Sequence, residues 1–242
     1  MAPRSPEGPA VGQALSSVWR RTLDLVFPPR CVGCGAFGSF LCEQCLSATP
    51  RAQPPRCSVC WMPGSEDVCG RCRAEPPGFE AARCPFVYQG AARDAVHALK
   101  YDGLSALAPA MAAAMADCLR EWSPAVGAIV PVPLAGARKR GRGYNQSELL
   151  ARELSRLSGL PMAKGVLARR KGGPAQARAS DEAARRSNVA AAFEARPRDG
   201  LAGPLLLIDD VMTSGSTLDA CARALVEAGL GPVFALTFAR ED

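Results

Sequence analysis

The residues with the clearest chemistry lie between Leu205 and Thr217, where the chain reads Leu-Leu-Leu-Ile-Asp-Asp-Val-Met-Thr-Ser-Gly-Ser-Thr. The four apolar residues predict a short buried strand of the kind found in parallel sheets. Asp209 and Asp210 are expected where that strand ends. Because carboxylates accept hydrogen bonds from hydroxyl groups, this pair suits the neighbouring hydroxyls of a ribose. Two adjacent aspartates without a ligand or partner at this point would be costly to desolvate.

A loop of small residues joins the acidic pair to a helix predicted over residues 218–228. A loop that opens a helix presents unpaired backbone N–H groups and the positive end of the helix dipole, so it can bind a phosphate. Glycine allows close approach, and the hydroxyl groups add donors; the loop residues are Thr213, Ser214, Gly215, Ser216 and Thr217. The segment therefore predicts a ribose 5-phosphate site. A nucleoside triphosphate fits less well, because no Gly-x-x-x-x-Gly-Lys-Ser/Thr loop occurs in the chain. The competing interpretation is a buried strand followed by an ordinary capped helix.

Cysteine spacing predicts a second kind of site. Eight of the 11 cysteines form four C-x-x-C pairs: Cys31 and Cys34, Cys42 and Cys45, Cys57 and Cys60, and Cys69 and Cys72. One such pair directs two thiolates at one metal ion, and two pairs complete a tetrahedral zinc site. We expect two structural Zn²⁺ ions, with consecutive pairs sharing an ion; an interleaved arrangement stays open. Disulfides are disfavoured because no secretory signal is evident, and a redox C-x-x-C normally occurs once.

The chain is predicted to have three parts. These are an N-terminal tail with an amphipathic helix (1–30), a double zinc ribbon (31–80) and an α/β domain with a mostly parallel sheet (81–242). The expected strands are 84–88, 128–132, 205–208 and 233–238, and the expected helices are 92–100, 104–121, 147–158 and 218–228. No stretch approaches the roughly 20 apolar residues of a membrane span, and Arg20 and Arg21 interrupt the apolar N-terminal segment. We therefore expect a cytoplasmic protein.

Positive charge is concentrated in one part of the chain. The net charge is +6, but residues 134–198 hold 15 Lys and Arg against 5 Asp and Glu. This segment predicts contact with a polyanion, either pyrophosphate or nucleic acid, although many of its arginines can simply be solvated. The loop after strand 128–132 carries Arg138 and Arg140 at the sheet edge where α/β proteins bind ligands. Residues 167–193 are expected to form a mobile loop or hairpin.

Several motifs together resemble the ComF family. They are the four C-x-x-C pairs, Leu-Lys-Tyr-Asp-Gly at 99–103, Val-Pro-Val-Pro-Leu at 130–134, Arg-Gly-Tyr-Asn-Gln at 142–146, Arg-Arg-Ser-Asn-Val at 185–189 and the acidic loop. The resemblance covers nearly the whole chain after residue 30, in the family's order. The family joins a double zinc ribbon to a type I phosphoribosyltransferase domain and includes competence proteins and gluconate-linked GntX proteins.

The resemblance implies that the chain binds phosphoribosyl pyrophosphate (PRPP) with Mg²⁺. Asp209 and Asp210 would be the catalytic pair that holds the ribose, and residues 213–217 would hold the 5′-phosphate. Arg138, Arg140 and Lys100 would contact pyrophosphate, and the segment around Arg169, Arg170 and Gln176 would close over it. The phosphoribosyltransferase half is also similar to glutamine PRPP amidotransferase, but the start Met1-Ala2-Pro3 offers no catalytic N-terminal cysteine.

Two functions follow from this resemblance. The first is phosphoribosyl (pentosyl) transfer to an acceptor that the sequence does not identify, linked to nucleotide metabolism or to single-stranded DNA and the DNA-uptake machinery in transformable bacteria. The second is a non-catalytic protein that senses PRPP and binds nucleic acid or regulates. Aromatic residues make up only 6% of the chain, so base stacking is limited and DNA contact would run through the phosphates. The sequence leaves the oligomeric state open, a homo-oligomer included.

Overall fold

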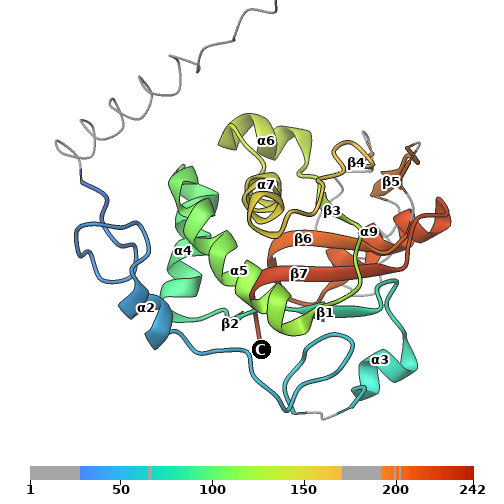
Figure 1. Cartoon of the computed structure of the whole chain (residues 1–242), viewed down its shortest axis with the longest axis horizontal. Coiled ribbons are helices and arrows are strands. Elements are labelled where there is room, and N and C mark those ends of the chain that lie inside the picture. Colours follow the sequence, from blue (N-terminus) through green and yellow to red (C-terminus); the bar gives the residue numbers. More distant parts are fainter. Residues whose placement is uncertain (1–27, 65–66, 171–191, 199, 202) are drawn as a thin grey trace, which may run out of the picture.

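The computed structural model describes residues 28–64, 67–170, 192–198, 200–201 and 203–242 (Figure 1). Its centre is a parallel sheet with the order β1-β7-β6-β3, in which β2 also pairs with β7. The strands are β1 (Ala81–Arg83), β2 (Phe86–Val87), β3 (Ala128–Pro131), β6 (Leu205–Met212) and β7 (Val233–Arg240). A separate antiparallel pair joins β4 (Leu167–Arg169) to β5 (Phe193–Ala195). The prediction of an α/β protein with a mostly parallel sheet is confirmed.

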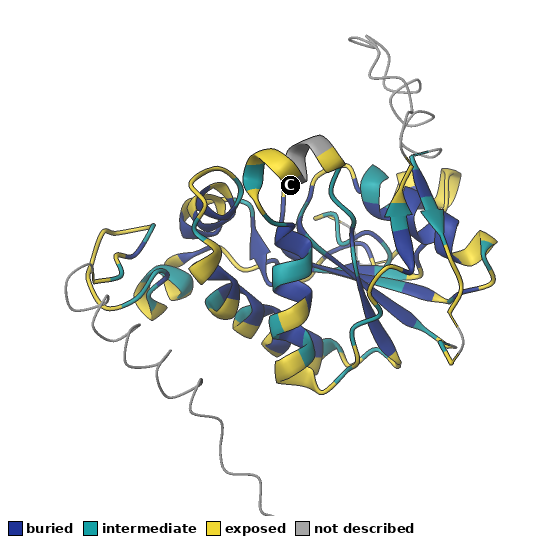
Figure 2. Cartoon of the chain, turned by 90° about the horizontal axis from the view of Figure 1, so that it is seen from above, coloured by how far each residue is buried: buried dark blue, intermediate teal, exposed yellow. Residues whose placement is uncertain are grey.

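Helices cover both faces of the sheet. Successive residues of a strand point to opposite sides, so the apolar strands present side chains on both faces for helices to bury. On one face, α4 (Gly90–Tyr101), α5 (Ala108–Trp122) and α7 (Gln146–Ser158) pack on Leu206, Ile208 and Phe238. On the other face, α9 (Ser216–Glu227) packs on Leu205, Leu207 and Val233. Figure 2 shows the buried positions running along the strands and the inner sides of the helices. This burial of two faces explains why the central strands are almost entirely apolar.

Two predicted elements are interrupted. The strand expected at 84–88 is replaced by β1 and β2, which lie on either side of Cys84 and Pro85. Proline has no N–H for the ladder, and the Pro85 carbonyl accepts a hydrogen bond from the backbone of Ala52 at 3.0 Å. The helix expected at 104–121 is divided into a 3-10 turn (η1, Ser105–Leu107) and α5, which has Pro109 in its first turn. Proline is tolerated there because the first N–H groups of a helix have no partner.

The edge that carries the acidic pair also differs from the prediction. β6 continues to Met212, so Asp209 and Asp210 lie within the strand and not beyond it. Pairing with β7 extends the strand, since Asp209 lies opposite Thr237 and Met212 opposite Arg240. The segment expected as a loop after β3 contains a short helix, α6 (Gly136–Arg142), in keeping with its alanine and basic residues, which favour helix.

The hairpin expected at 167–193 is present in its two arms, β4 and β5, while Gln176 lies outside the described residues. The amphipathic helix expected within 1–30 and the motif at 185–189 also lie outside them. Residues 28–30 are described and lead directly into the first cysteine pair.

The cysteine-rich segments pack against different parts of the sheet. We call residues 31–45 the first ribbon and residues 57–72 the second ribbon. The first ribbon reaches α2 (Glu43–Ala48) and packs against α4, where Gly33 lies close to Ala91. The second ribbon reaches α3 (Gly70–Ala74) and shares an apolar cluster with α9 and the sheet through its buried cysteines. Each ribbon is therefore joined to a different face of the same core.

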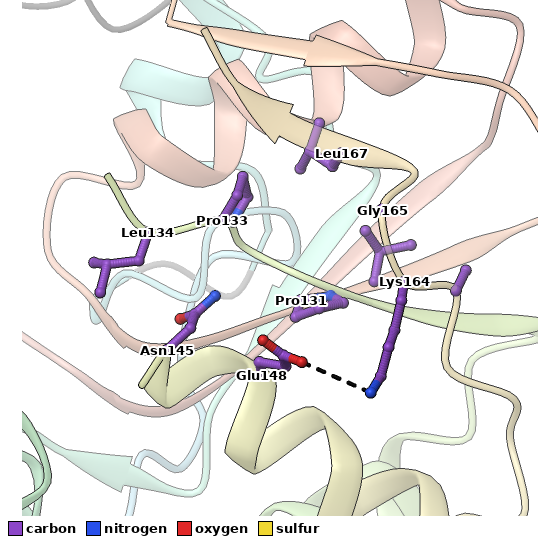
Figure 3. A pocket seen from close by; sticks show the side chains of 10 residues that line it. Pro131, Pro133, Leu134, Asn145, Glu148, Lys164, Gly165 and Leu167 are labelled. Atoms are coloured by element: carbon purple, nitrogen blue, oxygen red, sulfur yellow. Dashed lines mark ion pairs between the residues drawn. The ribbon is translucent and has the colours of Figure 1, made fainter. Parts of the chain in front are cut away.

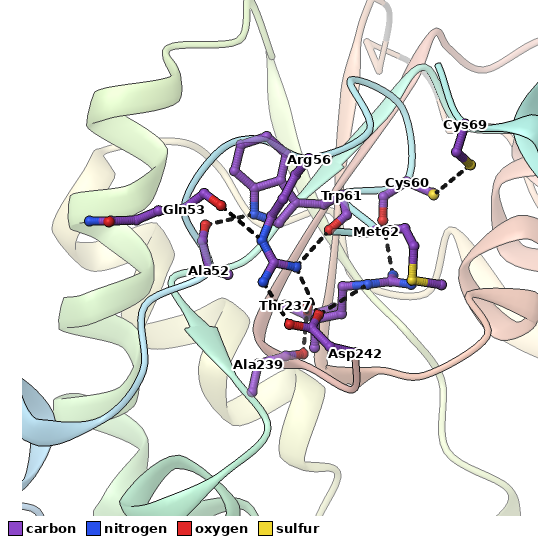
Figure 4. Close-up of polar contacts among 11 residues, drawn as sticks. Ala52, Gln53, Arg56, Cys60, Trp61, Met62, Cys69, Thr237, Ala239 and Asp242 are labelled. Atoms are coloured by element: carbon purple, nitrogen blue, oxygen red, sulfur yellow. Dashed lines mark hydrogen bonds and ion pairs between the residues drawn. The ribbon is translucent and has the colours of Figure 1, made fainter. Parts of the chain in front are cut away.

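Polar contacts attach the second ribbon to the end of β7 (Figure 4). The Arg56 guanidinium forms two hydrogen bonds with the Asp242 carboxylate, at 2.7 and 2.6 Å. It also donates to the carbonyl of Trp61 at 3.0 Å. The fully buried Arg240 donates from Nη1 to the carbonyl of Cys60 at 2.9 Å. These contacts fix the second ribbon to the sheet from which the candidate site is built.

Candidate functional site

Each ribbon brings four cysteines together. The four Sγ atoms of Cys31, Cys34, Cys42 and Cys45 lie within 4.8 Å of one another, and so do those of Cys57, Cys60, Cys69 and Cys72. The Sγ–Sγ distance is 3.7 Å both in the first ribbon (Cys34 to Cys42) and in the second (Cys60 to Cys69). A tetrahedron with Zn–S bonds of about 2.3 Å has edges of about 3.8 Å, whereas a disulfide would require about 2.05 Å. The sequential pairing is confirmed, and the four-cysteine groups fit zinc.

Backbone N–H groups stabilise the thiolate form of one cysteine in each group. The backbone of Cys42 donates to Sγ of Cys31 at 3.3 Å, and the backbone of Cys69 donates in the same way to Sγ of Cys57 at 3.3 Å. Burial alone would raise the pKa of the Cys31 and Cys57 thiols. The hydrogen bonds from the backbone outweigh it and lower the pKa of each to about 6. A thiolate is the form that binds a metal, so both groups are zinc-binding sites of the same design.

A cleft of about 470 Å³ opens at the carboxyl ends of β3 and β6. This is the edge at which open α/β sheets bind ligands. Side chains from several elements line it: Lys100 and Tyr101 of α4, Arg142 of α6, Gln146 and Ser147 of α7, Arg169 of β4, Asp209 and Asp210 of β6, Thr213 of the following loop and Thr217 of α9. Three cationic and two acidic side chains therefore converge on one space from segments far apart in the sequence.

Asp210 is the most buried charge in the cleft. Its side chain is 4% exposed, and its Oδ1 lies 2.7 Å from Nζ of Lys100. The second oxygen, Oδ2, is buried and has no hydrogen-bond partner among the described residues. A buried acceptor without a donor costs free energy, so this oxygen suits a hydroxyl group or a cation supplied by a ligand. Lys100 neutralises the carboxylate rather than capping its own helix.

Asp209 is held by a neighbouring helix. Its Oδ1 accepts a hydrogen bond from Oγ of Ser147 at 2.7 Å and another from the backbone of Asp210 at 2.9 Å. Burial raises the pKa of Asp209 to about 7, and the negative charge of Asp210 adds to the shift. At neutral pH the Asp209 carboxyl is therefore close to half protonated, and a bound cation would favour its ionised form.

Ser147 is positioned by the start of α7. The N-cap residue, Asn145, accepts a hydrogen bond from the backbone of Ser147 at 3.1 Å and donates from Nδ2 to the carbonyl of Val132 at 2.9 Å. An asparagine N-cap satisfies an otherwise unpaired N–H of the first turn. Tyr144 donates to the carbonyl of Leu99 at 2.6 Å, one residue before Lys100. The Tyr-Asn-Gln-Ser segment thus connects α4, the end of β3 and the acidic pair.

The loop after β6 has the geometry of an anion-binding turn. Gly215 adopts a φ of 80°, a left-handed conformation that favours glycine. The 12-residue helix α9 begins directly after it, at Ser216. The hydroxyls of Ser214 and Ser216 lie 2.9 Å apart at the surface, while Thr213 and Thr217 line the cleft. The N-terminal end of α9 therefore faces the region of the acidic pair with its unpaired N–H groups.

A smaller pocket of about 200 Å³ adjoins the cleft and shares Pro133, Leu134 and Asn145 with it. Figure 3 shows Glu148 and Lys164 on its polar side, with Oε1 and Nζ 3.7 Å apart. Proline and leucine side chains form its apolar side. The pocket combines an apolar wall with one ion pair, which is the usual composition of a site for a small organic group.

Comparison with known proteins gives matches for the zinc ribbons alone and for most of the chain. Residues 22–73 match the family model described as Double zinc ribbon domain. The chain is 29% identical over 201 residues to the DNA utilization protein YhgH of Salmonella typhimurium, covering 80% of this chain and 87% of that protein. It is 27% identical over 212 residues to the competence protein ComFC of Streptococcus pneumoniae, covering 84% and 88%.

Over most of its length the chain is therefore similar to proteins named for DNA utilization and competence, ComFC among them. Among solved structures, a glutamine PRPP amidotransferase from B. subtilis aligns with a TM-score of 0.36 and 19% identity, over 54% of this chain and 26% of that one. The predicted ComF architecture, a zinc-ribbon region before a parallel α/β domain, is confirmed. None of the described helices has the length and apolar content needed to cross a membrane.

The structure brings together five of the ten predicted ligand-binding residues in the cleft: Lys100, Asp209, Asp210, Thr213 and Thr217. Ser214, Gly215 and Ser216 form the adjoining loop without lining the cleft, and Arg140 is exposed outside it. The side chain of Arg138 is not described.

Sequence reasoning assigned no role to five polar residues that line the cleft: Tyr101, Arg142, Asn145, Gln146 and Ser147. Four of them belong to motifs that carry the ComF resemblance, at 99–103 and 142–146. Those motifs were the available signal. Ser147 had none, because its contact with Asp209 joins α7 to a strand 62 residues away.

Proposed function

We propose that the cleft binds PRPP with Mg²⁺ and transfers its phosphoribosyl group to an acceptor. The observation that carries this proposal is the buried Oδ2 of Asp210, which has no partner and lies in the cleft beside the Lys100 ion pair. A ribose hydroxyl would satisfy that oxygen by donating to it. The phosphate-binding geometry of the 213–217 loop supports the same ligand, because a pentose 5-phosphate spans the two.

The carboxylates suit the ribose of PRPP, and the hydroxyls of the loop suit its 5′-phosphate. Asp209 and Asp210 accept the ribose hydroxyls, and residues 213–217 hold the 5′-phosphate. The cations Arg142 and Arg169 line the cleft and suit pyrophosphate. Arg138 and Arg140 belong to the same short helix as Arg142, outside the described lining of the cleft. Asp209 and Asp210 are also the oxygen ligands in the cleft best suited to Mg²⁺, a hard cation that would neutralise charge on the departing pyrophosphate.

In the proposed reaction, the bond between C1 of the ribose and pyrophosphate breaks, and the acceptor forms the new bond to C1. Positive charge develops on the ribose as pyrophosphate leaves. The Asp210 carboxylate stabilises that charge, and Lys100 holds it in position through the ion pair at 2.7 Å. Ser147 orients Asp209 through its hydrogen bond. Most of the work of the protein is therefore orientation and electrostatic stabilisation.

The test is to titrate zinc-loaded protein with PRPP and MgCl₂ in a calorimeter and to follow pyrophosphate release with candidate acceptors. We expect saturable binding that Asp210→Asn weakens by at least about tenfold, since it removes a charged hydrogen-bond acceptor. Pyrophosphate release that needs an acceptor, and that is lost in the same variant, would support transfer. The absence of PRPP binding by the wild-type protein would contradict the proposal.

A second candidate function is PRPP sensing by a protein that handles DNA. The observation that favours it is the naming of relatives as a DNA utilization protein and a competence protein, together with the excess of 10 positive charges in residues 134–198. In this case the protein acts in the cytoplasm on single-stranded DNA, through contacts with phosphates that weaken as salt rises. PRPP binding without pyrophosphate release, together with binding of single-stranded DNA, would select this function over transfer.

A further inference from the structure

The second ribbon touches the loop that follows β6. Arg71 lies on α3 between two cysteines of the zinc group, Cys69 and Cys72. Its Nη2 donates a hydrogen bond to the backbone carbonyl of Ser214 at 2.5 Å. The same nitrogen is 3.7 Å from the place that a Cβ on Gly215 would occupy. A cationic side chain from a zinc knuckle therefore holds the middle of a loop that contains no Lys or Arg of its own.

The segment that follows the second ribbon in the sequence also contacts the first turn of α9. Asp219 accepts hydrogen bonds from the backbone of Gly78 at 2.6 Å and from Nε of Arg223 at 2.9 Å. Arg223 in turn donates to the carbonyl of Pro76 at 2.8 Å. A Cβ on Gly78 would lie only 2.9 Å from the backbone nitrogen of Arg223. The segment 71–78 and the loop with its helix thus form one closely packed unit.

The metal has a direct effect on this contact. Helix α3 contains five residues, too few to be stable as an isolated helix. Two zinc ligands, one at its N-cap and one within it, fix both its place and its conformation. Without the metal these ligands lose their common centre, and Arg71 loses the backbone that directs it at Ser214. The first ribbon packs instead against α4, away from this loop.

We propose that the second zinc ribbon is part of the phosphate-binding site, with Arg71 as a positioning residue for the Ser214–Ser216 turn. This inference rests on the proposed function. Zinc at Cys57, Cys60, Cys69 and Cys72 and the phosphate of a ligand at the loop are then coupled. Because coupling between two binding sites is reciprocal, each bound species slows or opposes loss of the other.

The test compares two arginines of one helix. In zinc-loaded full-length protein, Arg71→Ala is expected to weaken binding of Mg²⁺–PRPP by about fivefold, because it removes one charged hydrogen bond at the surface. Arg71→Lys restores part of the loss. Arg73→Ala is the matched control, since Nε of Arg73 donates to Val68 inside the ribbon and not to the loop. Metal analysis must give the same zinc content for all four proteins.

A second measurement does not depend on activity. Zinc release to a chelator is followed with and without Mg²⁺–PRPP, in wild-type protein and in Arg71→Ala. We expect the ligand to slow release of one of the two zinc ions in wild type by about fivefold and to lose this effect in the variant. Assignment of the slowed ion follows from Cys34→Ser, which removes a ligand of the first ribbon and should leave the slowed ion in place.

The outcomes separate this inference from the function on which it rests. PRPP that binds wild type and Arg71→Ala equally, or that slows release of neither or both zinc ions, would overturn the coupling while the proposed function stands. A wild-type protein that binds no PRPP would overturn both.

Discussion

The two zinc ribbons each hold four cysteines and share one equivalent backbone-to-sulfur hydrogen bond, but they have different surroundings. In the first ribbon Cys34 is exposed and only Cys31 is buried, whereas in the second Cys57, Cys60 and Cys72 are all buried. The second ribbon is packed into the cluster that contains α9 and the sheet, and it also contacts the candidate phosphate loop. Of two copies of one metal motif, one can therefore lie apart from the candidate site while the other is in contact with its loop.

The largest expected difference between the ribbons is in stability. Cys60→Ser should lower the free energy of unfolding by more than about 4 kcal/mol, and Cys34→Ser by about 2 kcal/mol, because a structural zinc contributes on the order of 10 kcal/mol and Cys60 is buried in an apolar core cluster whereas Cys34 is exposed. Denaturant unfolding of both variants, with zinc counted in each, measures the difference. Equal losses would show that the surroundings of the two groups do not matter.

The next comparison removes a buried contact of the second ribbon. Arg56 directly precedes the second ribbon; its side chain is 5% exposed and pairs with Asp242, which follows the last strand. Arg56→Ala should destabilise the protein by about 3 kcal/mol, since it breaks a largely buried ion pair and leaves the carbonyl of Trp61 without this donor.

The matched control for that change is the exposed pair of Arg120 and Asp117 on α5, with side chains 73% and 53% exposed. Asp117→Ala should change the free energy of unfolding by less than about 0.5 kcal/mol. Thermal and denaturant unfolding measure both. If Arg56→Ala were as mild as the control, the second ribbon would be only loosely attached to the sheet.

A smaller effect is expected in how the affinity of the cleft for Mg²⁺–PRPP depends on pH. Because burial raises the pKa of Asp209 from 3.8 to about 7, its stabilising contribution is complete below pH 3.8 and is lost as the pH rises through 7. Binding of Mg²⁺–PRPP needs the ionised carboxylate, so affinity should rise about tenfold between pH 6 and pH 8, with proton release on binding. Calorimetry in buffers of different ionisation heat measures both.

Two variants sharpen the comparison of the ribbons in that experiment. Asp209→Asn should remove the pH dependence. Cys34→Ser should keep it, because the first ribbon packs on α4 near Ala91 and its Cys34 is exposed. A pH response that vanishes with the first zinc would contradict the division of roles between the ribbons.

Local patterns predicted the parts of the site that are local in the chain. The C-x-x-C spacing predicted both metal groups, the apolar run before Asp209 predicted a buried strand, and the small residues after it predicted the turn into a helix. Phosphate binding by that turn stays a prediction. The extension of β6 to Met212 was missed because it depends on pairing with β7, which the run of four apolar residues does not encode. The α6 helix was missed because glycines and arginines were taken to indicate a loop.

Contacts between distant segments could not be predicted from these patterns. Lys100 was expected to contact pyrophosphate, and its pairing with Asp210 depends on how α4 packs over β6. Arg71 had no signal at all, since its contact with Ser214 spans 143 residues and joins the zinc ribbon to the α/β sheet. The sequence identifies the chemical groups, and the packing of helices and ribbons on the sheet decides which of them meet.

The central claim is that the cleft at the end of β6 binds a pentose phosphate through Asp210 and the following loop. Calorimetric titration of Mg²⁺–PRPP into zinc-loaded protein tests it most directly, with Asp210→Asn measured beside the wild type. The account predicts one saturable site per chain that is weakened at least about tenfold in the variant. No uptake of PRPP by fully zinc-loaded wild-type protein at millimolar Mg²⁺ would contradict it.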